Sequence, residues 1–307
     1  MKVDVIIPVY KPDASFFDLI DRLQKQTYQI HQIILMNTEE KYFEKLVYGT
    51  SFIDSHRNVR VFHLSKREFD HGKTRHIGME KSKADICLLM TQDAIPADDR
   101  LVEKLVKAME QPDVVSAYAR QLPNATCNPI EKYLRSFNYP EVSRVKTLED
   151  LPALGIKTFF CSNVCCAYKR EKYMELGGFV RHTIFNEDMI FASKVIRSGY
   201  AIAYEADAKV IHSHNYTCAA QLHRNFDLGV SQAQHPEVFA DVPSEGEGIR
   251  SVKAVAKHLW NEKLWTWIPY LVAQSGFKYL GYLLGKKYKK LPLWMVKKLS
   301  MNKEYWN

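Results

Sequence analysis

Short apolar runs alternate with amphipathic segments along the first 120 residues of the chain. Continuous apolar runs of this length are typical of strands buried on both faces of a sheet. The segments between them place apolar side chains at helical spacing, as at Phe16, Leu19 and Leu23. This repetition predicts an α/β fold with a mostly parallel sheet and right-handed crossovers. The predicted strands are 3–9, 32–36, 59–64, 85–90 and 114–119, and the predicted helices are 14–26, 74–83 and 98–109.

The pattern becomes less regular in the second half of the main domain. Residues 123–154 contain several prolines and predict a loop-rich insertion over the carboxyl edge of the sheet. Regular elements then return, and Gly199 is placed to end one of the helices. The predicted strands here are 159–168, 201–205 and 209–212, and the predicted helices are 188–198 and 218–229.

The composition changes near residue 242. The stretch VPSEGEG over 242–248 predicts a linker, so we divide the chain into a main domain (1–241), a linker (242–249) and a C-terminal helical region (250–307). Within that region, 264–285 is largely apolar and has about the ~20 residues that a membrane span needs. Pro269, Gln274 and Lys278 interrupt it. We therefore favour a helix lying in a membrane interface, with a core-packing helix and a spanning helix as alternatives.

Charge is distributed unevenly between these regions. Residues 1–249 carry 31 Lys and Arg against 33 acidic residues, a net of −2, whereas residues 250–307 carry 12 against 2, a net of +10. This distribution argues against a nucleic-acid-binding protein and favours contact between the C-terminal region and an anionic membrane surface.

The cysteines and the N-terminus bear on the compartment. The six cysteines include no CxxC pair, and most lie in apolar runs, as buried free thiols do. This usage predicts a reduced, cytoplasmic environment. The chain enters its first strand at once, so we expect no signal peptide.

Two acidic positions carry the most chemical information. Asp93 ends a buried strand, and Glu187-Asp188 opens a helix about 95 residues later. Open α/β sheets bind ligands outside the carboxyl ends of their strands. One carboxylate there can hold Mg²⁺ or Mn²⁺ on a diphosphate, and another can take a proton from a hydroxyl. Helix capping and dipole complementation are the structural alternatives, but together the positions favour group transfer from an activated donor.

Candidate nucleotide-binding residues lie at strand ends and at the start of one helix. A proline and an aromatic ring can line a base, although, taken alone, a strand-terminating proline is the better explanation. Amide and acidic side chains can hydrogen-bond a base or ribose, or cap the next helix. Glycine and arginine at a helix amino terminus suit a diphosphate. The candidates are Pro8, Val9, Tyr10, Asn37, Glu39, Asp70, Gly72, Arg75 and Gln92.

Two further pairs are candidates near the same edge. His212 and His214 share one strand face, where an imidazole can ligate the metal expected at Asp93; a polar loop with one buried histidine is the alternative. Gln221 and Arg224 share one helix face. Arg224 can stabilise a departing diphosphate, or it is a surface arginine.

Taken together, these motifs resemble the inverting family 2 glycosyltransferases of the GT-A nucleotide-sugar fold. The likeness runs in order over about residues 1–229 and includes 5–10, 74–76, 92–93, 177–179, 187–188 and Gln221-x-x-Arg224. Further segments look like the bacterial rhamnosyltransferase branch. These are 69–72, 91–93, 120–123, 137–140, 162–163 and 212–214.

The resemblance implies roles for the acidic positions. Asp93 matches the last acid of the family's DxD motif and would hold the cation, with Thr91 in place of the first acid. Asp188 of the ED pair would be the general base, and Glu187 would help to bind the acceptor. Asn37 stands where the family usually has Asp.

The resemblance also implies how the sugar is added. Gln221 and Arg224 match the family's QxxRW motif and would contact the acceptor, but Asn225 replaces the Trp that processive synthases usually retain. We therefore expect single-sugar addition.

The implied reaction moves L-rhamnose from dTDP-β-L-rhamnose to a hydroxyl of a lipid-linked saccharide, with inversion, in cell-wall or surface polysaccharide biosynthesis. The alternatives are another donor, carrying galactofuranose, glucose or N-acetylglucosamine, and a non-catalytic binding protein on the same fold. The expected location is the cytoplasm, peripheral on the inner face of the cell membrane. Nothing in the sequence indicates an oligomeric state.

Overall fold

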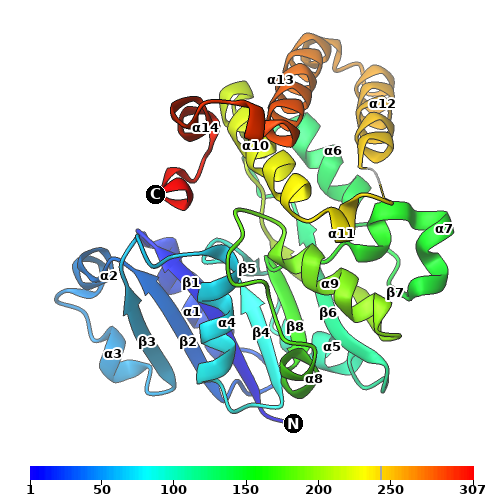
Figure 1. Ribbon diagram of the computed structural model, residues 1–307. Coiled ribbons are helices and arrows are strands. Elements are labelled where there is room, and N and C mark those ends of the chain that lie inside the picture. Colours follow the sequence, from blue (N-terminus) through cyan, green and yellow to red (C-terminus); the bar gives the residue numbers. More distant parts are fainter. Residues whose placement is uncertain (243) are drawn as a thin grey trace.

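The computed structural model describes residues 1–242 and 244–307, and in this part of the chain nine strands form one mixed sheet (Figure 1). The strands are β1 (Val3–Tyr10), β2 (Gln32–Thr38), β3 (Val59–Leu64), β4 (Ile86–Met90), β5 (Ile95–Pro96), β6 (Val114–Leu122), β7 (Arg144–Lys146), β8 (Cys165–Lys169) and β9 (Ala201–Ile211). Their order is β3-β2-β1-β4-β8-β6-β9-β5, with β7 paired to β9. The α/β expectation is confirmed, and the antiparallel strands β5, β7 and β8 make the sheet mixed.

Helices flank the sheet and extend beyond one end of it (Figure 1). The α-helices are α1 (Ser15–Gln24), α2 (Glu40–Val47), α3 (Phe52–Ser55), α4 (His71–Lys81), α5 (Leu101–Ala108), α6 (Pro129–Asn138), α7 (Leu151–Leu154), α8 (Arg170–Glu175), α9 (Glu187–Arg197), α10 (Cys218–Gln234), α11 (Pro236–Phe239), α12 (Glu245–Asn261), α13 (Ile268–Lys286) and α14 (Leu293–Leu299). Short 3-10 helices are η1 (Leu148–Asp150), η2 (Gly155–Phe159), η3 (Trp265–Trp267), η4 (Tyr288–Lys290) and η5 (Lys303–Trp306).

Alternation along the buried strands gives the sheet a hydrophobic core on each face. In β1, Val5 and Ile7 belong to the cluster that includes Phe16 of α1, whereas Ile6 belongs to the cluster that includes Phe191 of α9. Successive strand residues point to opposite faces, so a continuous apolar run serves both cores.

Three predicted strands differ from the structure. The predicted strands 201–205 and 209–212 are one strand, because a bulge lets both parts continue beside β6: Ala119 pairs with Glu205, and Arg120 pairs with Lys209. The strand predicted over 159–168 begins only at Cys165. The residues before it form η2 and a turn, which brings Asn163 to the start of α9.

The insertion 123–154 is more regular than predicted. It contains α6, β7, η1 and α7. Pro129 takes the first turn of α6, where its missing N–H costs no hydrogen bond, and the Asn128 side chain accepts from Glu131 N at 2.9 Å. These local signals begin a helix that also packs against α12.

The prediction of a linker over 242–249 is corrected by the structure. Helix α12 begins at Glu245, so most of that stretch is helical, and residue 243 lies outside the described residues. Two glycines near the start of a helix suggested a turn, but the apolar face of α12 supplies Val255 and Leu259 to a buried cluster with Ile130 of α6. Tertiary packing thus overrides the local glycine preference.

Helix α13 packs closely along α10. A Cβ at Gly281 would lie 2.2 Å from the Leu222 carbonyl oxygen, and one at Gly285 would lie 2.1 Å from that of Phe226. The opposing surface of α13 exposes Val272, 66% accessible. Among the described helices, none combines the length and apolar character that crossing a membrane requires. One face of the predicted interfacial segment is therefore a packing face.

The glycine contact predicts a difference between two alanine substitutions in α13. Gly285→Ala should lower the Tm by about 3–8 °C, because its Cβ overlaps α10 and overpacking costs about 1–3 kcal/mol. A Cβ at Gly276 would meet nothing within 4 Å, so Gly276→Ala is the matched control and should keep or raise the Tm. Thermal unfolding checks both variants, and equal Tm values would contradict the close contact.

Candidate active site

Both acidic positions lie at the carboxyl edge of the sheet, joined by a chain of contacts. His212 Nδ1 lies 3.0 Å from Gln121 Oε1, and Gln121 Nε2 donates to Ser162 Oγ at 3.0 Å. The next residue, Asn163, donates its backbone N–H to Asp188 Oδ2 at 3.1 Å. The histidines after β9, the end of β6 and the start of α9 thus form one site.

Asp93, His212 and His214 form a compact cluster in which the nearest atoms are potential metal ligands. Asp93 Oδ2 lies 3.5 Å from His212 Nε2 and 3.2 Å from His214 Nε2, and the two nitrogens are 3.1 Å apart. Asp93 follows β4, and both histidines follow β9, which places the cluster at two strand ends. The sequence prediction that these three residues meet agrees with this geometry.

The donor set of this cluster fits a divalent cation. One carboxylate oxygen and two imidazole nitrogens leave coordination positions for diphosphate oxygens, and the imidazoles suit Mn²⁺ better than Mg²⁺. Burial raises the pKa of Asp93, but its contacts with the His212 and His214 imidazoles outweigh that effect and hold the pKa below its usual value. Burial also lowers the pKa of His212, which favours the neutral, ligating imidazole.

The second acidic position, Glu187-Asp188, lies in a hydrogen-bonded network around the buried Glu187 side chain. Its Oε1 lies 3.3 Å from Arg75 Nη1 and accepts from Asn163 Nδ2 at 3.1 Å. Asp188 Oδ2 accepts from the Asn163 backbone, and its Oδ1 accepts from Met189 N at 2.8 Å. Asn163 therefore holds both carboxylates, one through its side chain and one through its backbone.

The two adjacent carboxylates have opposite pKa shifts. Burial raises the pKa of Glu187, but the charges of Arg75 and His71 and the hydrogen bond from Asn163 together outweigh burial, so the pKa of Glu187 stays below its usual value. Burial and the charge of Glu187 raise the pKa of Asp188 to about 7. A carboxylate with that pKa is suited to accept a proton at neutral pH.

Asp70 and Gly72 connect helix α4 to the loop before α9. Asp70 Oδ1 accepts from Gly72 N at 2.8 Å and Lys73 N at 2.9 Å, and its Oδ2 accepts from Thr183 N at 3.1 Å. A Cβ at Gly72 would lie 1.8 Å from the Val180 carbonyl oxygen, so only glycine allows this approach. The sequence predicts donor binding for both residues, and the structure gives them these positioning contacts.

The candidates at the end of β1 are also engaged. Tyr10 N donates to Gln92 Oε1 at 2.8 Å, and Gln92 Nε2 donates to the Tyr10 carbonyl at 2.9 Å, which ties the ends of β1 and β4 together. The Tyr10 ring is 37% exposed and meets Tyr42 edge-on at 5.8 Å. Pro8 is half-buried, and Val9 is buried in the core.

The candidates after β2 differ in how fully they are paired. Asn37 is buried, with Nδ2 2.9 Å from His63 Nδ1, but its Oδ1 has no hydrogen-bond partner among the described residues. Glu39 accepts from the backbone of Lys66 at 2.7 Å. Asn37 Oδ1 is thus a buried acceptor without a partner in the described chain, whereas Glu39 holds the loop after β3.

Arg224 and Gln221 lie on α10, near the acidic network. The Arg224 guanidinium stacks 4.6 Å from the Phe185 ring centroid and 5.7 Å from that of Tyr216, with no carboxylate at ion-pair distance in the described chain. Gln221 is buried and accepts from Asn225 Nδ2 at 3.3 Å. Arg224 is therefore held by rings, with its charge available for an anion.

Sequence reasoning missed Asn163, Gln121 and Arg135 as parts of this site, where Arg135 Nη1 donates to Gln121 Oε1. Asn163 and Gln121 do lie in segments that resemble rhamnosyltransferases, and that likeness was the one available signal. Asn163 contacts Asp188, 25 positions away, and Gln121 contacts His212, 91 positions away. Spacing along the sequence does not reveal contacts of this kind.

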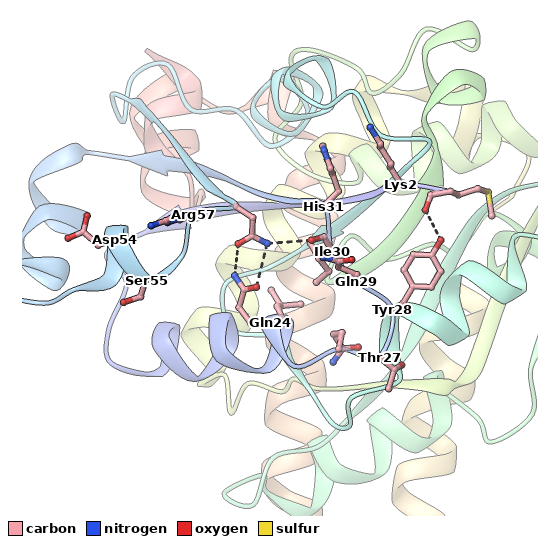
Figure 2. A pocket seen from close by; sticks show the side chains of 14 residues that line it. Lys2, Gln24, Thr27, Tyr28, Gln29, Ile30, His31, Asp54, Ser55 and Arg57 are labelled. Atoms are coloured by element: carbon pink, nitrogen blue, oxygen red, sulfur yellow. Dashed lines mark hydrogen bonds between the residues drawn. The ribbon is translucent and has the colours of Figure 1, made fainter.

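A hollow of about 940 Å³ lies at the other edge of the sheet (Figure 2). Its lining comes from the segments before β1, β2 and β3 and from the ends of α1 and α3. It includes Lys2, Ile30 and Asn58, and Gln24 Nε2 donates to Asn58 Oδ1 at 2.6 Å. It contains none of the predicted site residues. Cavity size alone therefore does not identify the site that contains the carboxylates.

The comparisons with known proteins agree with this geometry. The profile described as Glycosyl transferase family 2 matches residues 4–177. The O-antigen chain rhamnosyltransferase RfbN of Salmonella typhimurium is 38% identical over 100% of this chain and 96% of its own length. The O-antigen chain rhamnosyltransferase WbaN of Salmonella anatum is 36% identical over 99% and 95%.

Solved structures share the fold at low identity. The mannosyltransferase PcManGT of Pyrobaculum calidifontis, in complex with GDP-Man and Mn²⁺, has a TM-score of 0.60 and 14% identity, covering 94% of this chain and 88% of its own. S. aureus TarS 1–349 has a TM-score of 0.51 and 11% identity, covering 94% and 91%. The GT-A expectation and the resemblance to bacterial rhamnosyltransferases are both confirmed. The chain belongs to glycosyl transferase family 2 and is a glycosyltransferase.

Proposed function

We propose that this enzyme transfers L-rhamnose from dTDP-β-L-rhamnose to a hydroxyl of a lipid-linked saccharide, with inversion, in O-antigen or other surface polysaccharide synthesis. The observation that carries the reaction type is Asp188, a half-buried carboxylate with a pKa of about 7 beside a charged Glu187. The sugar and the pathway are supported by the two relatives named as O-antigen chain rhamnosyltransferases.

Inversion follows from a single displacement with a base on the acceptor side. As the acceptor oxygen bonds to the anomeric carbon, Asp188 takes the hydroxyl proton and the bond to the diphosphate breaks. Asn163 fixes the Asp188 carboxylate through its backbone N–H, which leaves oxygen lone pairs for the incoming hydroxyl. Burial and the charge of Glu187 keep the pKa of Asp188 high, and Glu187 is itself held by Arg75.

The departing diphosphate requires positive charge. Asp93, His212 and His214 would hold a divalent cation, with Mn²⁺ fitting these donors better than Mg²⁺. Such a cation, when bound, neutralises charge on the diphosphate oxygens. The Arg224 guanidinium is a second positive group that can bind the diphosphate, because no carboxylate in the described chain forms an ion pair with it.

The donor end of the proposal rests on the loop ends of β1 and β2. Asn37 Oδ1 is a buried acceptor without a partner in the described residues, and it suits the N3–H of a thymine or uracil ring. Tyr10 and its neighbours Pro8 and Val9 lie at the same edge. These residues bind a pyrimidine nucleotide in our proposal without selecting among its sugars.

A donor panel tests the proposal. With Mn²⁺ and a polyprenyl-diphosphate saccharide acceptor, we expect acceptor-dependent release of dTDP from dTDP-β-L-rhamnose. UDP-galactofuranose, UDP-glucose and UDP-N-acetylglucosamine should be at least about tenfold poorer, because each mismatched sugar loses about 1.4 kcal/mol or more of transition-state binding.

Asp188→Asn is the matched variant for that panel. It should lower kcat about 10²–10⁴-fold, the range of general-base contributions, while the KM for the donor changes little. Transfer from another donor at a higher rate would reject rhamnose. Failure of every donor to react would favour the non-catalytic alternative.

We also propose that the C-terminal region, residues 250–307, attaches the enzyme to the inner face of the cytoplasmic membrane. It carries the net charge of +10, which complements anionic lipid. Its exposed tryptophans include Trp260 at 65%, Trp265 at 55% and Trp294 at 65% accessibility. Exposed indole rings among lysines are typical of interfacial attachment.

Vesicle sedimentation tests this attachment. The double variant Trp260→Ser, Trp265→Ser should bind phosphatidylglycerol vesicles about fivefold or more weakly, because about 1 kcal/mol of apolar burial is lost. Tyr48→Ser removes an aromatic ring that is 89% exposed outside this region, and it should bind like the wild type. Unchanged binding of the double variant, or equal binding to phosphatidylcholine, would contradict the proposal.

A further inference from the structure

The side chain of Gln121 joins the cation site to a charged pair on helix α6. Gln121 lies on β6 and is 2% exposed. Its Nε2 donates to Tyr139 Oη at 2.6 Å and to Ser162 Oγ at 3.0 Å. Its Oε1 accepts from Arg135 Nη1 and meets His212 Nδ1 at 3.0 Å. Every polar atom of this buried amide is thus paired.

Arg135 determines which way the amide of Gln121 points. A guanidinium has donors and no acceptor, so the amide atom that faces Arg135 must be the oxygen. The same oxygen faces His212 Nδ1, and an oxygen of an amide only accepts. His212 Nδ1 therefore carries the hydrogen.

The tautomer of His212 follows. With hydrogen on Nδ1, the neutral ring has a free lone pair on Nε2. That nitrogen is the one aimed at Asp93 Oδ2, 3.5 Å away, and at His214 Nε2, 3.1 Å away. The lone pair thus points to the centre of the three-residue cluster.

Glu131 holds Arg135 in place. Arg135 Nε donates to Glu131 Oε1 at 2.7 Å, one helical turn away on α6, and both side chains are largely shielded, at 18% and 13% exposure. Charge-assisted hydrogen bonds in a shielded site are stronger and better defined than neutral ones. The run Glu131, Arg135, Gln121, His212 is therefore continuous from α6 to the cation site.

We propose that Gln121, oriented by Arg135 and Glu131, is a positioning residue that fixes His212 as the Nδ1–H tautomer and presents its Nε2 to the divalent cation. Hydrogen-bond partners behind a metal-bound histidine set its ring orientation and basicity, and their removal typically costs about 10–100-fold in metal affinity. The inference rests on the cation site of the proposed function, but not on the identity of the sugar.

Two readouts that need no turnover test the inference. ¹⁵N-histidine NMR of the metal-free protein reports the tautomer of His212, and titration with MnCl₂, followed by the EPR signal of free Mn²⁺, reports affinity. We expect the wild type to show Nδ1–H on His212. Gln121→Leu removes the acceptor, so this tautomer should lose its dominance and Mn²⁺ affinity should fall about 10–100-fold.

Gln121→Glu separates positioning from packing. Its carboxylate still accepts from His212 and Arg135, so Mn²⁺ affinity should stay at or above the wild-type value. Gln26→Leu is the matched control, since Gln26 is buried, with Nε2 donating to Asp98 O at 2.9 Å, and belongs to the other edge of the sheet. It should leave both readouts unchanged. Arg135→Met repeats the test without altering β6 and should weaken Mn²⁺ binding severalfold.

Three results would overturn the inference. They are Nε2–H on His212 in the wild type, unchanged Mn²⁺ affinity in both Gln121→Leu and Arg135→Met, and no Mn²⁺ binding by the wild type. Rhamnosyl transfer is measured separately with the donor panel. A wrong donor with intact Mn²⁺ results rejects the proposed sugar and leaves the role of Gln121 standing.

Discussion

The buried charge of Glu187 is the constraint on which the site depends. An unpaired carboxylate in this position would be strongly destabilising, so its partners must be in place. Arg75 comes from α4, and Asn163 comes from the turn before β8. Satisfying Glu187 therefore brings together three segments that are far apart in the sequence, and the same arrangement places Asp188 against a fixed negative charge.

The residues proposed to bind the donor and those proposed to bind the acceptor are connected by direct contacts around this network. Asp70 caps α4 and also binds the backbone of Thr183, while Gly72 lets the Val180 carbonyl approach α4. Arg75 lies on that same helix and reaches Glu187. Residues whose sequence context suggests nucleotide binding thus also fix the loop that leads to the base. We therefore expect a substitution at the amino terminus of α4 to alter the position of Asp188 through these contacts.

The sequence predicted those parts of the structure that depend on local patterning. Strands β1 to β4 follow from their apolar runs, and the cluster of Asp93, His212 and His214 follows from polar residues placed after strand ends. The role of Asn163 was hidden because it depends on a turn inside a segment that looks like a strand. Gln121 was hidden because its partners come from α6 and from the residues after β9. The helical character of 245–249 was hidden because packing, not propensity, forms α12.

The pH dependence of kcat/KM in the wild type and in Glu187→Gln tests the role of the buried charge most directly. The base must be ionised, so the wild-type rate should fall tenfold per pH unit below about 7, the raised pKa of Asp188. Glu187→Gln removes the negative charge that raises the pKa of Asp188, and it leaves the Arg75 cation, which lowers that pKa. The pKa of Asp188 should therefore fall. The acid limb of the variant should move to lower pH accordingly. A wild-type limb near pH 4, or a limb that does not move in Glu187→Gln, would contradict the assignment of Asp188 as a base tuned by Glu187.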